Sequence, residues 1–395
     1  MKEEKKAKAG ETHEVNAKSS SEAKSTKGKT VVKKIITGLM TVLVIVCVSE
    51  VLLHIACRLT KGIWYPELRR REFPPLYNSD PVLRWRLRPD MNIRFTTGEF
   101  DTHIVTDAEG FRKESLGSAG KPRALVIGDS FSFGWGVEPK DTFSAILSRS
   151  HHIPASSKGI PGFGLEQEEL LLKEVLNKET PELVILQTWP LDWDILNSDR
   201  MEVAGHYLIS RDVLRNSPPW MVHMRITMME YSPLYGIITR SGTLIHHIFH
   251  RNELLGGFGL DVFSEGRQSE MVIQARTRAF GAIKRMRDMA DSRGVPFVVV
   301  IVPSVFQVYP ERQKSWERIY GISGRFDEDR PDRELKQFAD SEGIYLIDLL
   351  PFFKEKAGAS HQQLYFDIDP HWNAEGHKAA AEAIAEFVRK IGISE

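Results

Sequence analysis

Short apolar runs alternate with amphipathic segments through the C-terminal two thirds of the chain. Apolar runs predict buried strands at 124–127, near 155–160, and at 183–187, 296–302 and 344–350. Amphipathic patterns predict helices at about 141–150, 166–179, 269–292, 331–341 and 374–391. We expect Asp141 to cap the first of these helices and Asn373 the last. Apolar runs separated by helices predict an α/β fold with a doubly wound parallel sheet of about five strands.

This alternation stops between about residues 197 and 266. A loop of that length without structure of its own is unusual, so we expect a helical insertion that forms a cap or a surface for a partner or the membrane. His246, His247 and His250 lie in it. Three histidines on an amphipathic helix are usually surface or core residues, so neither a metal site nor any other cofactor is predicted.

The N-terminal part divides into a tail, an anchor and a lead-in. Residues 1–34 carry ten Lys, five Glu and no aromatic residue, which predicts a disordered basic tail. The stretch 35–57 is almost uncharged, and its first 22 residues reach about 33 Å as a helix, which predicts a single-pass transmembrane anchor. Residues 58–122 hold short extended patches and predict a small β-rich lead-in to the α/β domain at 123–395.

Charge and cysteine content say little about the orientation of the anchor, but they bear on nucleic-acid binding and on disulfides. Basic residues flank the anchor on both sides, so the charge pattern does not predict which end of it faces the cytoplasm. The formal net charge is zero, so no nucleic-acid partner is expected. The two cysteines, Cys47 and Cys57, lie within or beside the anchor, so no disulfide forms within the soluble part.

One candidate nucleophile follows the first strand of the α/β domain. Gly128-Asp129-Ser130 comes directly after the run "ALVI", at the carboxyl end of a strand, where ligands bind in open α/β sheets. Serine and aspartate are also good turn and capping residues, so the tripeptide alone leaves both interpretations open.

The C-terminal end supplies a base and an acid for that serine. His371 lies two residues after Asp369, just ahead of the final predicted helix, and Asp367 is the second candidate carboxylate. A serine hydroxyl needs a base to take its proton, and the base needs a carboxylate to hold its tautomer. We expect this pair on one loop after the last strand, at the same sheet edge as Ser130, as a Ser-His-Asp triad.

These motifs resemble those of the SGNH, or GDSL, hydrolases. The resemblance covers about residues 105–395 and includes "TDAEGFR", which is similar to a motif that precedes the first block in membrane-associated bacterial members. It implies a three-layer α/β/α sandwich in which Ser130 is the nucleophile, His371 the general base and Asp369 the orienting acid. It also implies an oxyanion hole formed by the N–H groups of Ser130 and of Gly162 in "GIPGFG".

This sequence departs from the family in the third of its conserved sequence motifs. That motif usually ends in Asn-Asp, and the Asn side chain donates to the oxyanion. Here the two residues are Leu191-Asp192, so this oxyanion donor is missing. Removing one such donor typically costs about 10²–10³ in rate. Either Thr188, Gln187 or the Trp193 indole replaces it, or catalysis is weak or lost.

The resemblance implies a membrane-anchored serine esterase that removes O-acyl groups, acetyl first among them, from an envelope or extracellular glycan. An O-acyltransferase that modifies exopolysaccharide or envelope glycan is the alternative, and a catalytically impaired glycan-binding or scaffolding member is the third. Trp189 and Trp193 are candidates to stack on a sugar ring, although tryptophan more often packs in the core, and Asp129 and Asp192 are candidates to support the site. The expected location is the inner membrane, with the domain in the periplasm, beside envelope-polysaccharide machinery.

Overall fold

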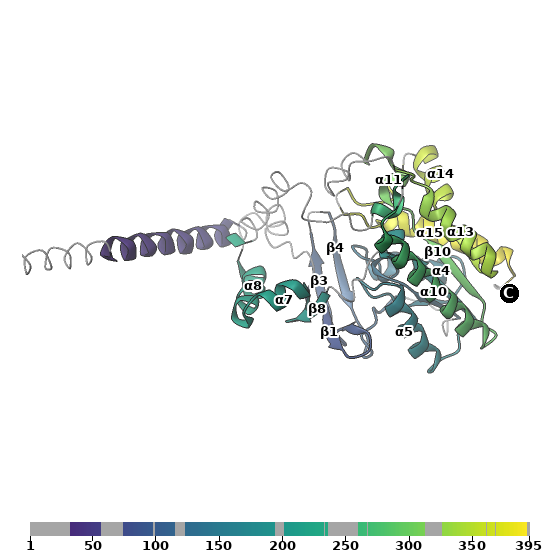
Figure 1. Ribbon diagram of the computed structural model, residues 1–395, viewed down its shortest axis with the longest axis horizontal. Helices are drawn as coiled ribbons and strands as arrows, with labels where there is room; N and C mark the ends of the chain where they lie inside the picture. Colours follow the sequence, from purple (N-terminus) through teal and green to yellow (C-terminus); the bar gives the residue numbers. More distant parts are fainter. Residues whose placement is uncertain are drawn as a thin grey trace, which may run out of the picture.

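A five-stranded parallel sheet forms the centre of the computed structural model (Figure 1). In spatial order its strands are β11 (Tyr345–Asp348), β10 (Phe297–Ile301), β7 (Leu183–Thr188), β5 (Ala124–Ile127) and β6 (Ala155–Ser157). The structure describes residues 32–56, 74–97, 99–114, 123–193, 201–232, 234–235, 260–266, 268–312, 326–360, 362–367 and 369–392.

Helices cover both faces of this sheet. Side chains alternate along β5, so that Leu125 and Ile127 enter one core and Ala124 and Val126 the other. The first core is closed by α5 (Leu165–Leu176), α10 (Glu270–Asp291) and α13 (Arg330–Glu342). The second is closed by α4 (Phe143–Ser150), α11 (Val305–Val308), α14 (Leu350–Ser360) and α15 (Ala374–Lys390). The predicted three-layer α/β/α sandwich is therefore confirmed.

One predicted helix cap was wrong, and one helix was not predicted. Thr142, not Asp141, caps α4, because the Thr142 Oγ1 accepts the N–H of Ala145 while Asp141 ends a short 3₁₀ turn, η1 (Pro139–Asp141). The sequence analysis did not predict α14, which lies between the last strand and the turn that carries Asp369 and His371. The predicted cap of α15 is confirmed, since Asn373 Oδ1 accepts two N–H groups of the first turn.

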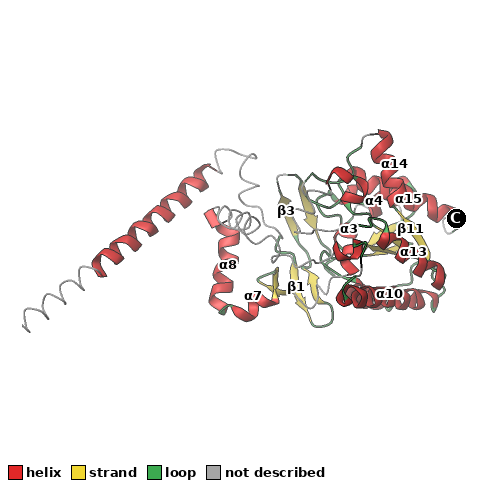
Figure 2. Ribbon diagram, turned by 45° about the horizontal axis from the view of Figure 1, so that its top comes forward, coloured by secondary structure: helices red, strands yellow, loops and turns green. Residues whose placement is uncertain are grey.

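Two antiparallel hairpins precede the sheet in sequence. They are β1 (Tyr77–Asp80) with β2 (Arg84–Leu87), and β3 (Asn92–Thr96) with β4 (Asp101–Val105). Their buried side chains, among them Trp85, Phe95 and Ile104, join the first core. Figures 1 and 2 show β1 and β3 between the sheet domain and helix α8.

The region where the strand and helix alternation stops contains a hairpin before its helices. The elements are β8 (Met201–Ala204), β9 (Tyr207–Ser210), α7 (Arg211–Asn216), α8 (Pro219–Tyr231) and the 3₁₀ turn η3 (Leu260–Phe263). The hairpin turn is Gly205-His206, with φ of 55° and 70°. Two positive φ angles match the turn that two-residue hairpins favour. His246, His247 and His250 lie outside the described residues.

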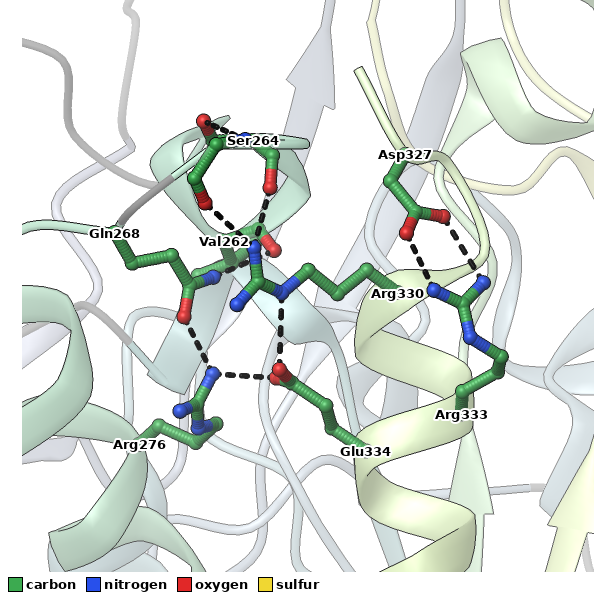
Figure 3. A network of polar contacts seen from close by, with 9 residues as sticks. Val262, Ser264, Gln268, Arg276, Asp327, Arg330, Arg333 and Glu334 are labelled. Atoms are coloured by element: carbon green, nitrogen blue, oxygen red, sulfur yellow. Dashed lines mark hydrogen bonds and ion pairs between the residues drawn. The ribbon is translucent and has the colours of Figure 1, made fainter. Parts of the chain in front are cut away.

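A polar network connects the chain after η3 to two long helices (Figure 3). Arg330 of α13 donates to the carbonyl of Ser264 at 2.5 Å and to Glu334 at 2.9 Å. Glu334 also accepts from Arg276 of α10, which donates to Gln268 at 2.6 Å. Because one carboxylate bridges two arginines, this network holds the residues before α10 against both helices.

The helix Val32–Ala56 is, within the described part of the chain, long and apolar enough to cross a membrane. None of its apolar window is buried against the protein, and Figure 1 shows it projecting away from the sheet domain. Length and composition fit an anchor as well as a signal sequence. The predicted tail, apart from its last three residues, and Cys57 lie outside the described residues.

His377 is a fully buried histidine on α15. Its Nδ1 accepts the N–H of Phe143 at 3.3 Å, and its ring stacks on the Phe143 ring with centroids 6.1 Å apart. Burial, with the nearby charge of Arg112 and the His371 ring adding to it, lowers the pKa of His377 to about 3. The folded protein therefore keeps this side chain neutral at pH values where the unfolded chain protonates it.

His377 predicts a loss of stability on acidification. Its depressed pKa contributes stability that is complete above about 6.5 and falls as the pH drops toward 3, by about 2 kcal/mol at pH 5. His377→Asn keeps an acceptor near the Nδ1 position but does not titrate. We expect its melting temperature to fall less than that of the wild type between pH 7.5 and pH 5.

The comparison with the wild type is essential here. Burial, with the charge of Asp348, raises the pKa of Asp332 to about 7. Between about pH 4 and pH 7 the contribution of Asp332 to the stability of the fold therefore increases as the pH falls, which opposes the effect of His377. His103→Asn makes the same chemical change at an exposed histidine and serves as the matched control. An equal fall in melting temperature between pH 7.5 and pH 5 for His377→Asn and the wild type would contradict the prediction.

Candidate active site

The turn after β5 presents Ser130 at the carboxyl edge of the sheet. A Cβ at Gly128 would lie 2.4 Å from the Gln187 Oε1 and 2.5 Å from the Ser132 Oγ, so only glycine fits there. Asp129 then caps the short helix α3 (Ser130–Phe133), because its Oδ1 accepts the N–H of Phe131 at 2.7 Å. Asp129 is thus a structural support of the turn that carries Ser130, the candidate nucleophile.

Gln187 of the neighbouring strand holds the same turn. Its Oε1 accepts from the Ser132 Oγ at 2.8 Å, from the Ser132 N–H at 3.1 Å and from the Asp129 N–H at 3.3 Å. These three contacts fix the direction in which α3 leaves the sheet, and with it the place of Ser130.

Ser130, His371 and Asp369 form one chain of hydrogen bonds. The His371 Nε2 lies 2.7 Å from the Ser130 Oγ, and its Nδ1 lies 2.5 Å from the Asp369 Oδ1. With a proton on Nδ1, the Nε2 lone pair faces the serine hydroxyl, as a general base requires. Asp367, the other candidate carboxylate, is 77% exposed and accepts from Arg312 and Gln363.

A tight turn carries the acid and the base. An isolated bridge joins Tyr365 to Trp372, and the N–H of Phe366 donates to the His371 carbonyl at 3.1 Å. The His371 N–H donates back to the Asp369 Oδ1 at 3.0 Å. These hydrogen bonds within the turn hold His371 in place beside Ser130, which lies 241 positions earlier in the sequence.

The environment of Asp369 keeps it ionised. Burial acts to raise its pKa, but the charge and hydrogen bonds of His371, together with the Trp135 indole, outweigh burial and hold the pKa below its usual value. The Asp369 N–H donates to the Glu99 Oε2 at 2.8 Å. A carboxylate that accepts from His371 and Trp135 is placed to orient His371 and to stabilise an imidazolium, as the acid of a triad must.

Aromatic rings enclose the imidazole of His371. The Phe131 ring centroid lies 4.9 Å from that of His371, and the Trp135 centroid lies 5.9 Å from it. Phe131 also packs on Trp189 and Trp372. These contacts restrict His371 to the rotamer that faces Ser130.

The other predicted site residues lie in different surroundings. Trp189 is half-buried beside Phe131, and its indole donates to the Ser304 Oγ at 3.0 Å. Trp193 is buried against Phe280, and its indole donates to the Thr188 Oγ1 at 3.0 Å, so that donor is already engaged. The side chains of Leu191 and Asp192 lie outside what the structure describes.

Two backbone amides are available as oxyanion donors. Among the described residues, no group accepts the N–H of Ser130 or of Gly162. Gly162 has a φ of +83°, which only glycine adopts readily. Its surroundings are apolar, because a Cβ there would lie 3.4 Å from Leu208 and 3.8 Å from Trp85.

Arg112 supports the site, and the sequence analysis missed its role. This buried guanidinium donates to four carbonyls, those of His103, Phe133, Gly134 and Val137, and to the Thr102 Oγ1. It thereby connects β4 to the loop that carries Trp135. Its place in "TDAEGFR" was the only available signal. No sequence signal pointed to Glu99, because it reaches the site from a hairpin turn that is distant in the sequence.

The comparisons with known proteins concern the second half of the chain most directly. Residues 260–394 match the family described as SGNH hydrolase-like domain, acetyltransferase AlgX. This third of the chain is therefore similar to an SGNH hydrolase-like domain. The matched residues include Asp369 and His371, and Ser130 lies before them. The family resemblance and the enzyme class expected from the sequence, an SGNH-type hydrolase or acetyltransferase, are confirmed.

Solved SGNH-type structures resemble the chain at low identity. A lipolytic protein of the G-D-S-L family from Desulfitobacterium hafniense is 13% identical with a TM-score of 0.36, over 67% of this chain and 99% of that one. The acetyl xylan esterase AlAXEase is 12% identical with a TM-score of 0.38, over 67% and 98%. The esterase EstA from Pseudoalteromonas is 12% identical with a TM-score of 0.36, over 68% and 98%. No curated protein matches this sequence.

Proposed function

We propose that this chain is a membrane-anchored serine O-acetyltransferase acting on a glycan. The observation that carries the proposal is the hydrogen-bonded sequence Ser130–His371–Asp369, the arrangement that activates a serine for acyl transfer. The acetyltransferase description of the matching family favours transfer of the acetyl group to an acceptor, and we take a sugar hydroxyl as that acceptor from the resemblance stated above. The helix Val32–Ala56 supports the membrane anchor.

The proposed reaction has two half-reactions. The Ser130 Oγ attacks the acetyl carbonyl, His371 takes the serine proton, and the N–H groups of Ser130 and Gly162 stabilise the oxyanion. His371 then protonates the leaving group. In the second half, an acceptor hydroxyl gives its proton to His371 and attacks the acetyl carbonyl, and His371 returns that proton to the Ser130 Oγ as the acetyl group leaves it. Trp189 is the aromatic residue beside the triad best suited to stack on a sugar ring.

An esterase is the second candidate. Ser130 is partly exposed, and the side chains of His371 and Asp369 retain 17% and 16% exposure, so water has access to the acyl-enzyme. The two functions share the first half-reaction and differ only in which acceptor removes the acetyl group.

Intact-protein mass spectrometry of the full chain in detergent, with para-nitrophenyl acetate as donor, tests the proposal. We expect one acetyl group, mapped to Ser130, in the wild type and none in Ser130→Ala. Ser150→Ala, at an exposed serine ending α4, is the control and should retain the adduct. An adduct elsewhere, or an equal one in Ser130→Ala, would contradict the proposal. Faster loss of the adduct when an oligosaccharide is added identifies a transferase, and an unchanged rate identifies an esterase.

A further inference from the structure

Helix α8 exposes an apolar stripe to solvent. Trp220, Met224 and Met228 follow one another at intervals of four residues, and Met221 lies beside them, so all four share one side of the helix. Trp220 is 63% exposed, and the three methionines are 40–42% exposed. Among the large apolar side chains exposed in the described residues, this is the group that gathers on one short helix outside Val32–Ala56.

The opposite side of α8 already has its packing partner. Val222 is buried, and Ile226 packs on the β8–β9 turn, where a Cβ at Gly205 would lie 3.3 Å from it. The exposed stripe is therefore not needed to hold α8 on the protein. Because one side of α8 packs on the protein and the other side is also apolar, the exposed stripe is expected to contact a second apolar environment.

The end of α8 meets the predicted membrane anchor. The N–H of Leu234, three residues beyond α8, donates to the Glu50 Oε2 at 3.1 Å. In both Figure 1 and Figure 2, α8 runs across the direction of the helix Val32–Ala56 and does not continue it. If that helix crosses a bilayer, α8 lies along its surface.

Glu50 marks the depth at which this contact occurs. The helix from Ile35 to Ala56 is about 33 Å long, and Glu50 lies on its last two turns, where its carboxylate is 3.9 Å from the His54 ring. Polar groups at the end of an apolar span belong in the headgroup region. The contact with Leu234 therefore brings α8 to the level of the headgroups.

We propose that α8 is an in-plane membrane helix whose apolar stripe inserts into the bilayer that holds the anchor. The proposal rests on the membrane anchoring proposed above. Tryptophan and methionine suit the boundary between headgroups and acyl chains, and the exposed Arg215 and Arg225 suit anionic headgroups. With the anchor, α8 gives the sheet domain two attachments, which fix the height and tilt of Ser130 relative to the membrane.

Depth-dependent fluorescence of the full chain in vesicles tests this. In a background of Cys47→Ala and Cys57→Ala, an environment-sensitive fluorophore is attached at Met224→Cys on the stripe, at Val44→Cys in the anchor, or at Lys336→Cys on the exposed side of α13. The vesicles contain phosphatidylcholine, phosphatidylglycerol and a lipid with a spin-label quencher on its acyl chain. We expect quenching at Met224 to be several-fold greater than at Lys336 and close to that at Val44.

Each alternative result overturns the proposal in a recognisable way. Quenching at Val44 with none at Met224 means that the anchor inserts and α8 stays in water. Protection of Met224 from aqueous iodide without lipid quenching means that protein, such as a second copy, covers the stripe. An absence of quenching at all three positions contradicts the anchor itself and, with it, the proposal for α8, while leaving the chemistry of Ser130 untouched.

Discussion

Replacing His371 by alanine is expected to lower acetyl-ester turnover by about four orders of magnitude, with little change in folding. The imidazole is the only group within hydrogen-bonding distance of the Ser130 Oγ among the described residues. Without it the hydroxyl keeps its proton, and catalysis falls to what the oxyanion donors and substrate binding supply. The measurement is kcat/KM for para-nitrophenyl acetate, with the melting temperature recorded beside it.

Asp369→Asn is the more discriminating variant of the same prediction. The amide has nearly the shape of the carboxylate but carries no charge, and a neutral partner can hold the wrong tautomer of His371. A loss of about 10⁴-fold in kcat is expected for this reason. Asp367→Asn makes the same chemical change two residues away, at an exposed side chain, and should alter turnover less than about twofold. Similar losses in both variants would exclude Asp369 as the orienting acid.

The fold and the triad could be predicted because their signals are local. The buried strands appear as apolar runs such as "LVILQ", and the nucleophile and the acid–base pair each lie in a short motif next to such a run or a helix. The carboxyl edge of a parallel sheet then brings Ser130 and His371 together without any knowledge of the intervening chain. The site roles of these residues stay predictions until the adduct and the variants are measured.

The parts that could not be predicted depend on tertiary contacts or on weak local signals. The α14 sequence "LPFFKEKAGAS" has no clear apolar stripe and contains a proline, which is tolerated only because it falls in the first turn. The β8–β9 hairpin turns on Gly-His, not on the usual Asn-Gly. Glu99 reaches Asp369 from 270 residues away, and no local pattern encodes such a contact.

Arg112→Met is expected to be the most destabilising single change outside the sheet. The guanidinium is buried, and burial lowers its pKa to about 10, so it stays charged at neutral pH. Its removal takes one donor from each of four carbonyls and from the Thr102 Oγ1, although the Thr102 hydroxyl still donates to the Val137 carbonyl and the Val137 N–H to the Gly134 carbonyl. Breaking a buried charged network of this kind costs about 3–5 kcal/mol, which corresponds to a melting temperature lower by roughly 5–10 °C.

The same variant should also lower activity in the fraction that remains folded. Arg112 acts as a positioning residue, because it holds the loop that places Trp135 against His371 and Asp369. We expect kcat to fall at least tenfold at a temperature well below melting, and Arg112→Lys to recover part of it, since an ammonium can donate to some of the same carbonyls. Arg94→Met, which removes an exposed ion pair, is the control and should cost less than about 1 kcal/mol with unchanged kcat. Full activity in folded Arg112→Met would mean that Arg112 stabilises the hairpins without positioning the triad.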